Sequence, residues 1–295
     1  MNYRHAFHAG NFADVLKHAV LALVLEHLKL KPKPFAVIDT HAGVGLYRLD
    51  GPEAARTGEW QHGIGRLLGP DAGPLPDAIA HLLSSYLGAV TAANPDGGLT
   101  RYPGSPALAL ALMRPQDRLV ANELHPEDAE ALRRAIGRDP RARVLALDGW
   151  LALKANLPPK ERRGVVLIDP PFEEPGEFDR LVQALGEGLL RFATGTYLLW
   201  FPIKDARAVA AFEAALARLE LEKLVWAELR LTPRTAGAKL HGTGLAILNP
   251  PFRLAEQLET LLAFLAGRLA TEDAGASWSV RRPGLLRVGT SPPDY

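Results

Sequence analysis

A short motif, Asp169-Pro170-Pro171-Phe172, directly follows the apolar run 164–168 and carries groups suited to chemistry. Because proline lacks an amide proton and fixes its backbone angle, the two prolines hold the Asp169 carboxylate and the Pro170 carbonyl rigidly. These two acceptors suit an amine with two hydrogens, such as the exocyclic amine of a base. Accepting both hydrogens localises the lone pair of that amine for attack, and Phe172 offers a face on which the base can stack. The motif predicts catalytic roles for Asp169, Pro170 and Phe172; a rigid stop between strand and helix is the alternative.

Carboxylates also follow the three preceding strands that the sequence predicts. Asp39 ends the first of these strands, Glu123 follows the second and Asp148 follows the third. In open α/β sheets, ligands bind outside the carboxyl ends of the strands. Acids at these places suit the amine, the ribose hydroxyls and the adenine amine of a nucleoside cofactor. Each acid has a structural alternative, because Glu123 and Asp148 can equally stabilise the start of the helices that follow them.

The turn after the first strand contains Gly43 and Gly45, where missing side chains allow a ligand to approach the backbone. It lacks the third glycine of the dinucleotide fingerprint and the Lys-Ser/Thr pair of a phosphate-binding loop. A nucleoside without phosphates to bind therefore fits this turn better than NAD or ATP.

A second copy of the proline motif, Asn249-Pro250-Pro251-Phe252, follows the apolar run 245–248. We predict that this strand is antiparallel, so that its end points to the edge of the sheet opposite Asp169. The second copy is therefore predicted to be a structural turn.

The elements that must position these residues alternate between strands and amphipathic helices, which predicts an α/β, Rossmann-like class I fold with a mostly parallel sheet. Seven strands are expected, the last two antiparallel, at 35–39, 118–122, 143–147, 164–168, 196–201, 223–231 and 244–248. Helices are expected at 11–30, 127–137, 177–192, 206–220 and 254–269. The segment 48–113 is longer than one crossover helix requires, so we expect a small inserted helical subdomain there, with helices at 64–68 and 77–87. The main domain then comprises 1–47 and 114–295; the tail 271–295 has few apolar residues and is left unassigned.

Composition excludes several classes of protein. The chain of 295 residues has 47% hydrophobic and 23% charged residues, as soluble globular proteins do. No apolar run approaches the ~18 residues of a membrane span, so no membrane association and a cytoplasmic location are expected. The absence of Cys excludes disulfides, thiolate metal sites and cysteine nucleophiles, including those of C5-pyrimidine methylation. A net charge of +1 gives no overall attraction to nucleic acid, so any such binding must use a local surface.

The N-terminal residues Tyr3, Arg4, His5, Phe7 and His8 combine aromatic faces with hydrogen-bond donors, a composition suited to stacking on bases and to phosphate contacts. His5 and His8 have the spacing of metal ligands, but no third ligand is nearby and no metal site is expected. A run of basic residues could also contact RNA phosphates, although solvated helix faces explain such runs at least as often: Arg133, Arg134, Arg138, Arg141, Arg143, Lys160, Arg162 and Arg163.

Several motifs together resemble the J-type bacterial 23S ribosomal RNA (adenine-N6) methyltransferases, which use S-adenosylmethionine. The resemblance extends from the N-terminus almost to the tail. It rests on Tyr3-Arg4-His5, Phe7-His8-Ala9-Gly10-Asn11, Ala13-Asp14-Val15-Leu16-Lys17-His18, Asp39-Thr40-His41-Ala42-Gly43, Arg56-Thr57-Gly58-Glu59, Tyr102-Pro103-Gly104-Ser105-Pro106, Glu123-Leu124-His125-Pro126, Asp148-Gly149, Asp169-Pro170-Pro171 and Asn249-Pro250-Pro251. Phe172 departs from the family pattern, where a Tyr is expected; a Phe keeps the stacking face.

The resemblance implies a Rossmann-like methyltransferase domain with an inserted helical subdomain, and it implies that Asp169 is catalytic. It also implies a set of residues that line the cofactor site, namely His18, His41, Ser105, Glu123, Asp148, Gly149 and Asp169. Tyr3 is implied to meet the RNA, and Arg4 is assigned to the same contact.

The expected reaction is direct methyl transfer from S-adenosylmethionine to N6 of an adenine in 23S ribosomal RNA, with the base flipped into the pocket. Because flipping costs less in unpaired strands, free or protein-stripped RNA is the expected substrate. No obligate protein partner is evident. Two alternatives stay open: a DNA adenine-N6 methyltransferase, which generally carries a larger target-reading domain, and a catalytically idle RNA-binding module.

Overall fold

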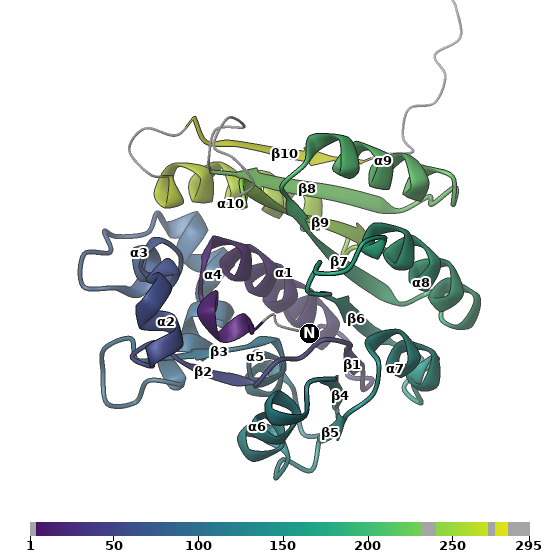
Figure 1. Cartoon of the computed structure of the whole chain (residues 1–295), viewed down its shortest axis with the longest axis horizontal. Coiled ribbons are helices and arrows are strands. Elements are labelled where there is room, and N and C mark those ends of the chain that lie inside the picture. The colour runs from purple at the N-terminus through teal and green to yellow at the C-terminus, as the bar shows by residue number, and fades with distance from the viewer. Residues whose placement is uncertain (1–3, 232–239, 271–274, 283–295) are drawn as a thin grey trace, which may run out of the picture.

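The computed structural model describes residues 4–231, 240–270 and 275–282. Its centre is a sheet with the strand order β10-β8-β9-β7-β6-β1-β4-β5 (Figure 1). The strands are β1 (Ala36–Asp39), β4 (Arg118–Asn122), β5 (Ala142–Leu145), β6 (Gly164–Ile168), β7 (Thr196–Ile203), β8 (Leu224–Arg230), β9 (Gly242–Leu248) and β10 (Ser277–Arg281). Neighbours from β5 to β7 pair in parallel, whereas β9 is antiparallel to both β7 and β8. The α/β fold and the antiparallel final pair are thus confirmed.

The sheet has eight strands rather than the seven predicted, because β10 pairs antiparallel with β8. β10 lies in the tail that the sequence pattern left unassigned. Val280 packs against the apolar core, and Arg281 pairs with Glu213, lies 3.5 Å from Glu228 and has its guanidinium 5.7 Å from the centre of the Trp226 ring. An edge strand that buries little apolar surface leaves only a weak pattern in the sequence.

Helices cover both faces of the sheet, and successive residues of β6 alternate between the two layers. Val166 and Ile168 belong to the cluster formed with α7 (Gly149–Asn156), α8 (Glu177–Arg191) and α9 (Ala206–Ala217). Val165 and Leu167 belong to the cluster on the opposite face, with α1 (Phe12–Lys29), α5 (Ser105–Leu112), α6 (Pro126–Ile136) and α10 (Leu254–Leu269). A strand buried on both faces explains the uninterrupted apolar run before Asp169. No helix in the described ranges is long and apolar enough to cross a membrane.

The segment between β1 and β4 contains the two expected helices and a small sheet that was not predicted. Strands β2 (Leu46–Arg48) and β3 (Arg101–Pro103) pair antiparallel at its base. Between them lie α2 (Pro52–Thr57), the 3-10 helix η2 (Glu59–His62), α3 (Gly65–Leu68) and α4 (Asp77–Ala92). α4 packs against α1 and α10 and shares their apolar cluster (Figure 1). The domain boundaries at 48 and 113 stay a prediction.

The second proline motif lies at the opposite edge of the sheet from Asp169, because β9 is antiparallel to β7. The Asn249 carbonyl accepts a hydrogen bond from Thr196 Oγ1, in the first residue of β7, at 2.9 Å. Its side-chain Nδ2 donates to the carbonyls of Ala193 and Gly195, each at 2.8 Å. Asn249 has φ of 49°, a left-handed conformation that asparagine tolerates better than most residues. These contacts are those of a turn.

We expect Asn249→Ala to lower the free energy of unfolding by about 1–2 kcal/mol, because two carbonyls lose their donor and alanine disfavours the positive φ. Urea unfolding measures this change. The folded variant should keep wild-type turnover, and a loss of turnover at unchanged stability would contradict the structural role.

Candidate active site

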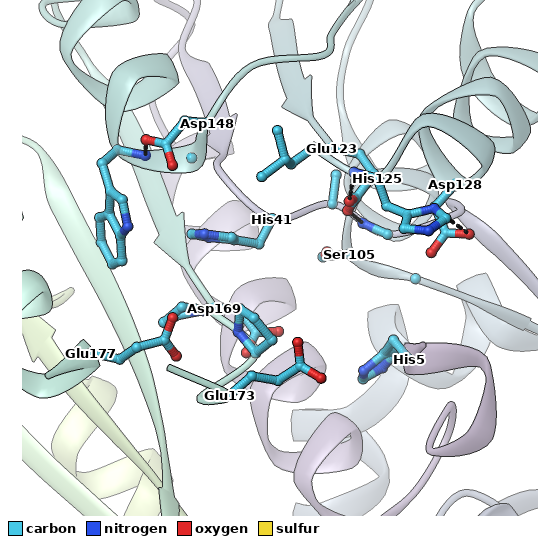
Figure 2. Close-up of a pocket in the computed structure, with 18 of the residues that line it drawn as sticks. His5, His41, Ser105, Glu123, His125, Asp128, Asp148, Asp169, Glu173 and Glu177 are labelled. Atoms are coloured by element: carbon cyan, nitrogen blue, oxygen red, sulfur yellow. Dashed lines mark hydrogen bonds and ion pairs between the residues drawn. The ribbon is translucent and has the colours of Figure 1, made fainter. Parts of the chain in front are cut away.

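A cavity opens at the carboxyl ends of the parallel strands (Figure 2). Seven predicted cofactor residues line it: His18, His41, Ser105, Glu123, Asp148, Gly149 and Asp169. Pro170 lines it as well, whereas Phe172 does not. Tyr3 lies outside the described residues. The structure therefore brings together side chains from α1, from the starts of α5 and α7, and from the ends of β1, β4 and β6.

The Asp169 carboxylate is paired with a buried ammonium group, that of Lys17 on α1. The same Lys17 Nζ lies 2.8 Å from Asp14 Oδ1, one helical turn away. The Lys17 side chain is only 5% exposed, and Nζ lies 5.9 Å from the centre of the Trp200 ring. The contact of Lys17 with Asp169 thus connects α1 to the Asp-Pro-Pro-Phe motif, 152 positions away in the sequence.

Two opposing effects act on these charges. Burial by itself would lower the pKa of Lys17, but the carboxylates of Asp14 and Asp169 raise it above its ordinary value. Burial would likewise raise the pKa of Asp14, but His5 and Lys17 hold it well below its usual range. Lys17 is therefore charged at neutral pH, and its ammonium group lies between the side chains of Asp14 and Asp169. Sequence reasoning missed this link, although an Asp-Lys pair at i, i+3 on a buried helix face was a usable signal.

Asp14 also holds the N-terminal segment against the cavity. His5 Nε2 and the Gly10 amide both lie 2.9 Å from Asp14 Oδ2, and the His5 ring lines the cavity. His8 contacts Glu59 at 3.0 Å. Each histidine therefore contacts a carboxylate, and no group of three metal-ligating residues occurs in the described part of the chain.

Arg4 forms ion pairs with Glu127 and Asp128 of α6, at 2.7 Å and 3.3 Å. These contacts place the first described residues beside His125 and Asp128, which line the cavity. Arg4 lies near the site in this arrangement, and its contact with RNA stays a prediction.

His18 belongs to a buried chain of hydrogen bonds. Its Nδ1 lies 2.7 Å from the Tyr102 hydroxyl, which in turn lies 3.0 Å from the Tyr86 hydroxyl. Burial lowers the pKa of His18 to about 3, so the ring is neutral at pH 7. If Tyr102 donates to Nδ1, the ring proton resides on Nε2, which is buried without a hydrogen-bond partner in the described structure. His18 Nε2 is thus available to donate to an anionic group of a ligand.

His41 is held by its neighbours on two sides. Its Nδ1 lies 2.8 Å from Thr40 Oγ1, and its ring meets Trp150 edge-on at 5.5 Å between centroids. Burial lowers the pKa of His41 to about 4, against the opposing effect of Asp169 and Asp148. A Cβ on Gly149 would lie 2.4 Å from His41 Nε2, so only glycine fits there. Figure 2 shows His41 between Asp148 and Asp169.

Glu123 and Asp148 both accept hydrogen bonds from nearby backbone amides, and both line the cavity. Glu123 accepts hydrogen bonds from the backbone of His125 at 2.8 Å and of Gly43 at 2.9 Å. Asp148 accepts from the Trp150 and Leu151 amides at the start of α7. Both side chains also line the cavity. Their backbone contacts fix the orientation in which they face a ligand.

Asp39 differs from the other strand-end acids because it is 1% exposed and does not line the cavity. Burial raises its pKa to about 7, although the nearby Ser105 side chain opposes the shift. Asp39 therefore titrates near neutral pH beneath the site rather than offering a ligand a permanent charge.

Phe172 packs away from the cavity. Its ring lies 4.9 Å from that of Phe178 and 5.7 Å from that of Trp200, at the edge of the apolar cluster under α8 and α9. Its φ of 53° is unusual for an aromatic residue. The cavity wall after the proline motif is instead acidic, with Glu173, Glu174 and Glu177, which sequence reasoning did not single out.

Four of the eight basic residues noted in the sequence contact acids or backbone carbonyls of the protein itself. Arg133 and Arg134 pair with Glu130, and Arg141 pairs with Asp139. Arg163 donates to the carbonyls of Leu28 and Lys33, at the amino end of β6. Arg141 and Arg163 thus tie loops together at the edge of the sheet opposite the cavity.

Comparisons with known proteins identify the family of the chain. Residues 32–281 match the sequence model of a family described as ribosomal RNA large subunit methyltransferase D, RlmJ. The chain belongs to this family. Two curated relatives are named ribosomal RNA large subunit methyltransferase J: one from Haemophilus influenzae is 43% identical over 281 residues, with 95% of this chain and 98% of the relative covered; one from Escherichia coli is 42% identical over 283 residues, with 95% and 99% covered.

A crystal structure of a Legionella pneumophila protein is 32% identical to the chain. It superposes with a TM-score of 0.85 and covers 94% of this chain and 99% of that one. The resemblance to the J-type methyltransferase family is confirmed, and the chain is a methyltransferase.

We expect Lys17→Met to lower methyl transfer at least tenfold, since Asp14 and Asp169 then lie close together without their shared cation. Breaking a buried pair in this way costs about 3–5 kcal/mol. Two neighbouring carboxylates without a cation bind a proton more readily, so the loss should be larger at pH 6 than at pH 8. Rates at both pH values measure it, with Lys29→Met on the same helix as control. An equal loss at both pH values in a stable variant would contradict the electrostatic role.

We expect Tyr102→Phe to weaken S-adenosylmethionine binding about threefold to tenfold, because His18 loses the hydrogen bond that selects its tautomer. Calorimetry measures the dissociation constant. Tyr197→Phe removes another buried hydroxyl, which bonds to the Phe192 carbonyl away from the cavity, and serves as control. Unchanged affinity in Tyr102→Phe would mean that His18 needs no such support.

Proposed function

We propose that the protein transfers a methyl group from S-adenosylmethionine to N6 of an adenine in 23S ribosomal RNA. The observation that carries the proposal is the placement of Asp169 and Pro170 in the wall of a cavity with the other six predicted cofactor residues. The relatives named ribosomal RNA large subunit methyltransferase J support the choice of large-subunit RNA. Direct transfer requires no covalent enzyme intermediate, consistent with a chain that has no Cys.

The cavity fits the cofactor in its donor and acceptor groups. His18 Nε2, which makes no hydrogen bond in the described structure and lies 4.0 Å from Asp14 Oδ1, suits the carboxylate of the methionine part. Glu123 suits the ribose hydroxyls, Asp148 suits the adenine amine, and Gly149 leaves room beside His41. When bound, S-adenosylmethionine supplies the electrophilic methyl group.

Asp169 and Pro170 act on the amine of the target adenine. The carboxylate and the Pro170 carbonyl accept its two hydrogens, which directs the nitrogen lone pair toward the methyl group. Lys17 fixes the direction of the Asp169 carboxylate, so that the acceptor is in place before the base arrives. Holding the reacting atoms in line can supply ~7–11 kcal/mol of the barrier reduction.

The target base must leave its stack to reach this cavity, at a cost of a few kcal/mol that is smaller in unpaired strands. Free or protein-stripped RNA is therefore the proposed substrate. Stacking of the base on Phe172 requires that ring to leave Phe178 and Trp200. Tyr3 and Arg4 are proposed to contact the RNA, and Arg4 lies against α6 beside the same cavity.

We expect Asp169→Ala to abolish methyl transfer, because the amine loses its charged acceptor. Transfer of labelled methyl groups to 23S ribosomal RNA transcripts measures turnover, and calorimetry checks that S-adenosylmethionine still binds. Asp179→Ala, an exposed acid on α8, is the control. Retained turnover in Asp169→Ala would contradict the proposed role of Asp169 as the acceptor for the target amine.

The substrate is tested separately by mass mapping of 23S ribosomal RNA from a strain lacking the gene and from its complemented counterpart. We expect one adenine to lose 14 Da in the deletion strain, the mass of one CH₂ unit. Methylation of duplex DNA but not of RNA transcripts would favour a DNA methyltransferase. No S-adenosylmethionine binding by the wild type would favour an idle RNA-binding module.

A further inference from the structure

A second cavity lies farther along the same edge of the sheet, at the carboxyl ends of β7 and β8. It is lined by Ile203, Lys204, Asp205, Ala206, Arg207, Arg230 and His241. β7 and β8 are both antiparallel to β9, so they end at the same edge, and β7 is parallel to β6. The carboxyl ends of β7 and β8 therefore point in the same direction as Asp169. Two backbone hydrogen bonds frame the cavity, from His241 to Ile203 and from Leu231 to His241, each 3.0 Å long.

The walls of this cavity carry an excess of positive charge. Lys204 and Arg207 are exposed, and neither forms an ion pair with another described residue. Arg230 is held by Glu228, with its Nη2 2.6 Å from Oε2. Asp205 is the one acid in the lining, and its carboxylate accepts from the Arg207 amide at 2.8 Å. This use of cations differs from that at the opposite edge, where Arg141 and Arg163 bind carbonyls and acids of the fold.

His241 provides an independent sign that a ligand completes the cavity. The residue is only 6% exposed, and its Nδ1 has no hydrogen-bond partner in the described part of the structure. A buried ring nitrogen without a partner costs free energy, which a bound ligand can recover. The cavity also faces the N-terminus of α9, a helix of 12 residues whose dipole favours an anion at this end.

We infer that this cavity binds a backbone phosphate of the substrate RNA, an inference that rests on the proposed function. Lys204 and Arg207 would contact the phosphate oxygens from the rim, with His241 below them. The lining offers only Ile203 and Ala206 as apolar residues, too little for a base or a lipid chain. With a net charge of only +1 on the whole chain, RNA affinity must come from such local groups.

The position suits a strand whose target base occupies the first cavity. β7 continues from Trp200 to Ile203 beyond its pairing of Leu199 with Ile168. At ~3.3 Å per residue along a strand and ~4.8 Å between strands, the end of β7 lies on the order of 15 Å from the end of β6. The site therefore contacts a phosphate a few nucleotides away from the methylated base and fixes the direction of the strand.

The salt dependence of RNA binding tests this inference. Each phosphate contact that is lost lowers the slope of log affinity against log salt by ~0.7 for a single strand. We expect Lys204→Ala and Arg207→Ala each to lower the slope by about this amount, and the double variant by about twice as much. Filter binding of a 23S ribosomal RNA transcript between 50 and 200 mM salt provides the measurement.

Arg218→Ala is the matched control, because Arg218 caps the other end of α9 and lies at the opposite edge of the sheet. It should leave the slope at the wild-type value. A double variant with the slope of Arg218→Ala overturns the inference. A second result would also overturn it. If the double variant no longer binds inorganic phosphate in calorimetry but keeps the wild-type salt slope for RNA, the cavity is a site for a free anion. If the wild type binds RNA but methylates only DNA, the proposed function fails while the phosphate contact stands.

Discussion

The ammonium group of Lys17 connects helix α1 to the end of strand β6 at the edge of the cavity. It lies buried between Asp14 and Asp169, and a charge in that position is stable only while both carboxylates are near it. α1 is therefore held against the end of β6, and the Asp169 carboxylate is held in one direction. Asp14 extends the connection to His5 and to the Gly10 amide, so the N-terminal segment depends on the same cluster.

Two histidines of the cavity, His18 and His41, are buried, neutral and oriented by neighbouring hydroxyl groups. Tyr102 orients His18 and Thr40 orients His41, while burial lowers the pKa of both rings far enough to keep them uncharged. Neutral rings can serve as directional donors or acceptors without adding repulsion next to Lys17. The permanent cations that line the cavity are Lys17 and Arg180, and the remaining permanent charges there belong to carboxylates.

The two edges of the sheet use their cations differently. At the amino edge, Arg141 and Arg163 are hydrogen-bonded to acids and carbonyls and stabilise loops. At the carboxyl edge, Lys204 and Arg207 project beside a buried histidine without ion pairs to described residues. In a chain of almost no net charge, cations without acidic partners at this edge are the groups that the proposed RNA contact uses.

The sequence by itself determined the α/β fold, seven strands of the sheet and the acids at the strand ends. Apolar periodicity is local, and parallel topology brings successive strand ends to one edge. Only the tertiary structure decided the rest. The pairing of Lys17 with Asp169 spans 152 positions, the ring of Phe172 turns toward Trp200, and β10 joins the sheet by pairing with β8, which is distant in the sequence. Such contacts depend on where distant side chains meet in space, which no periodicity along the chain records.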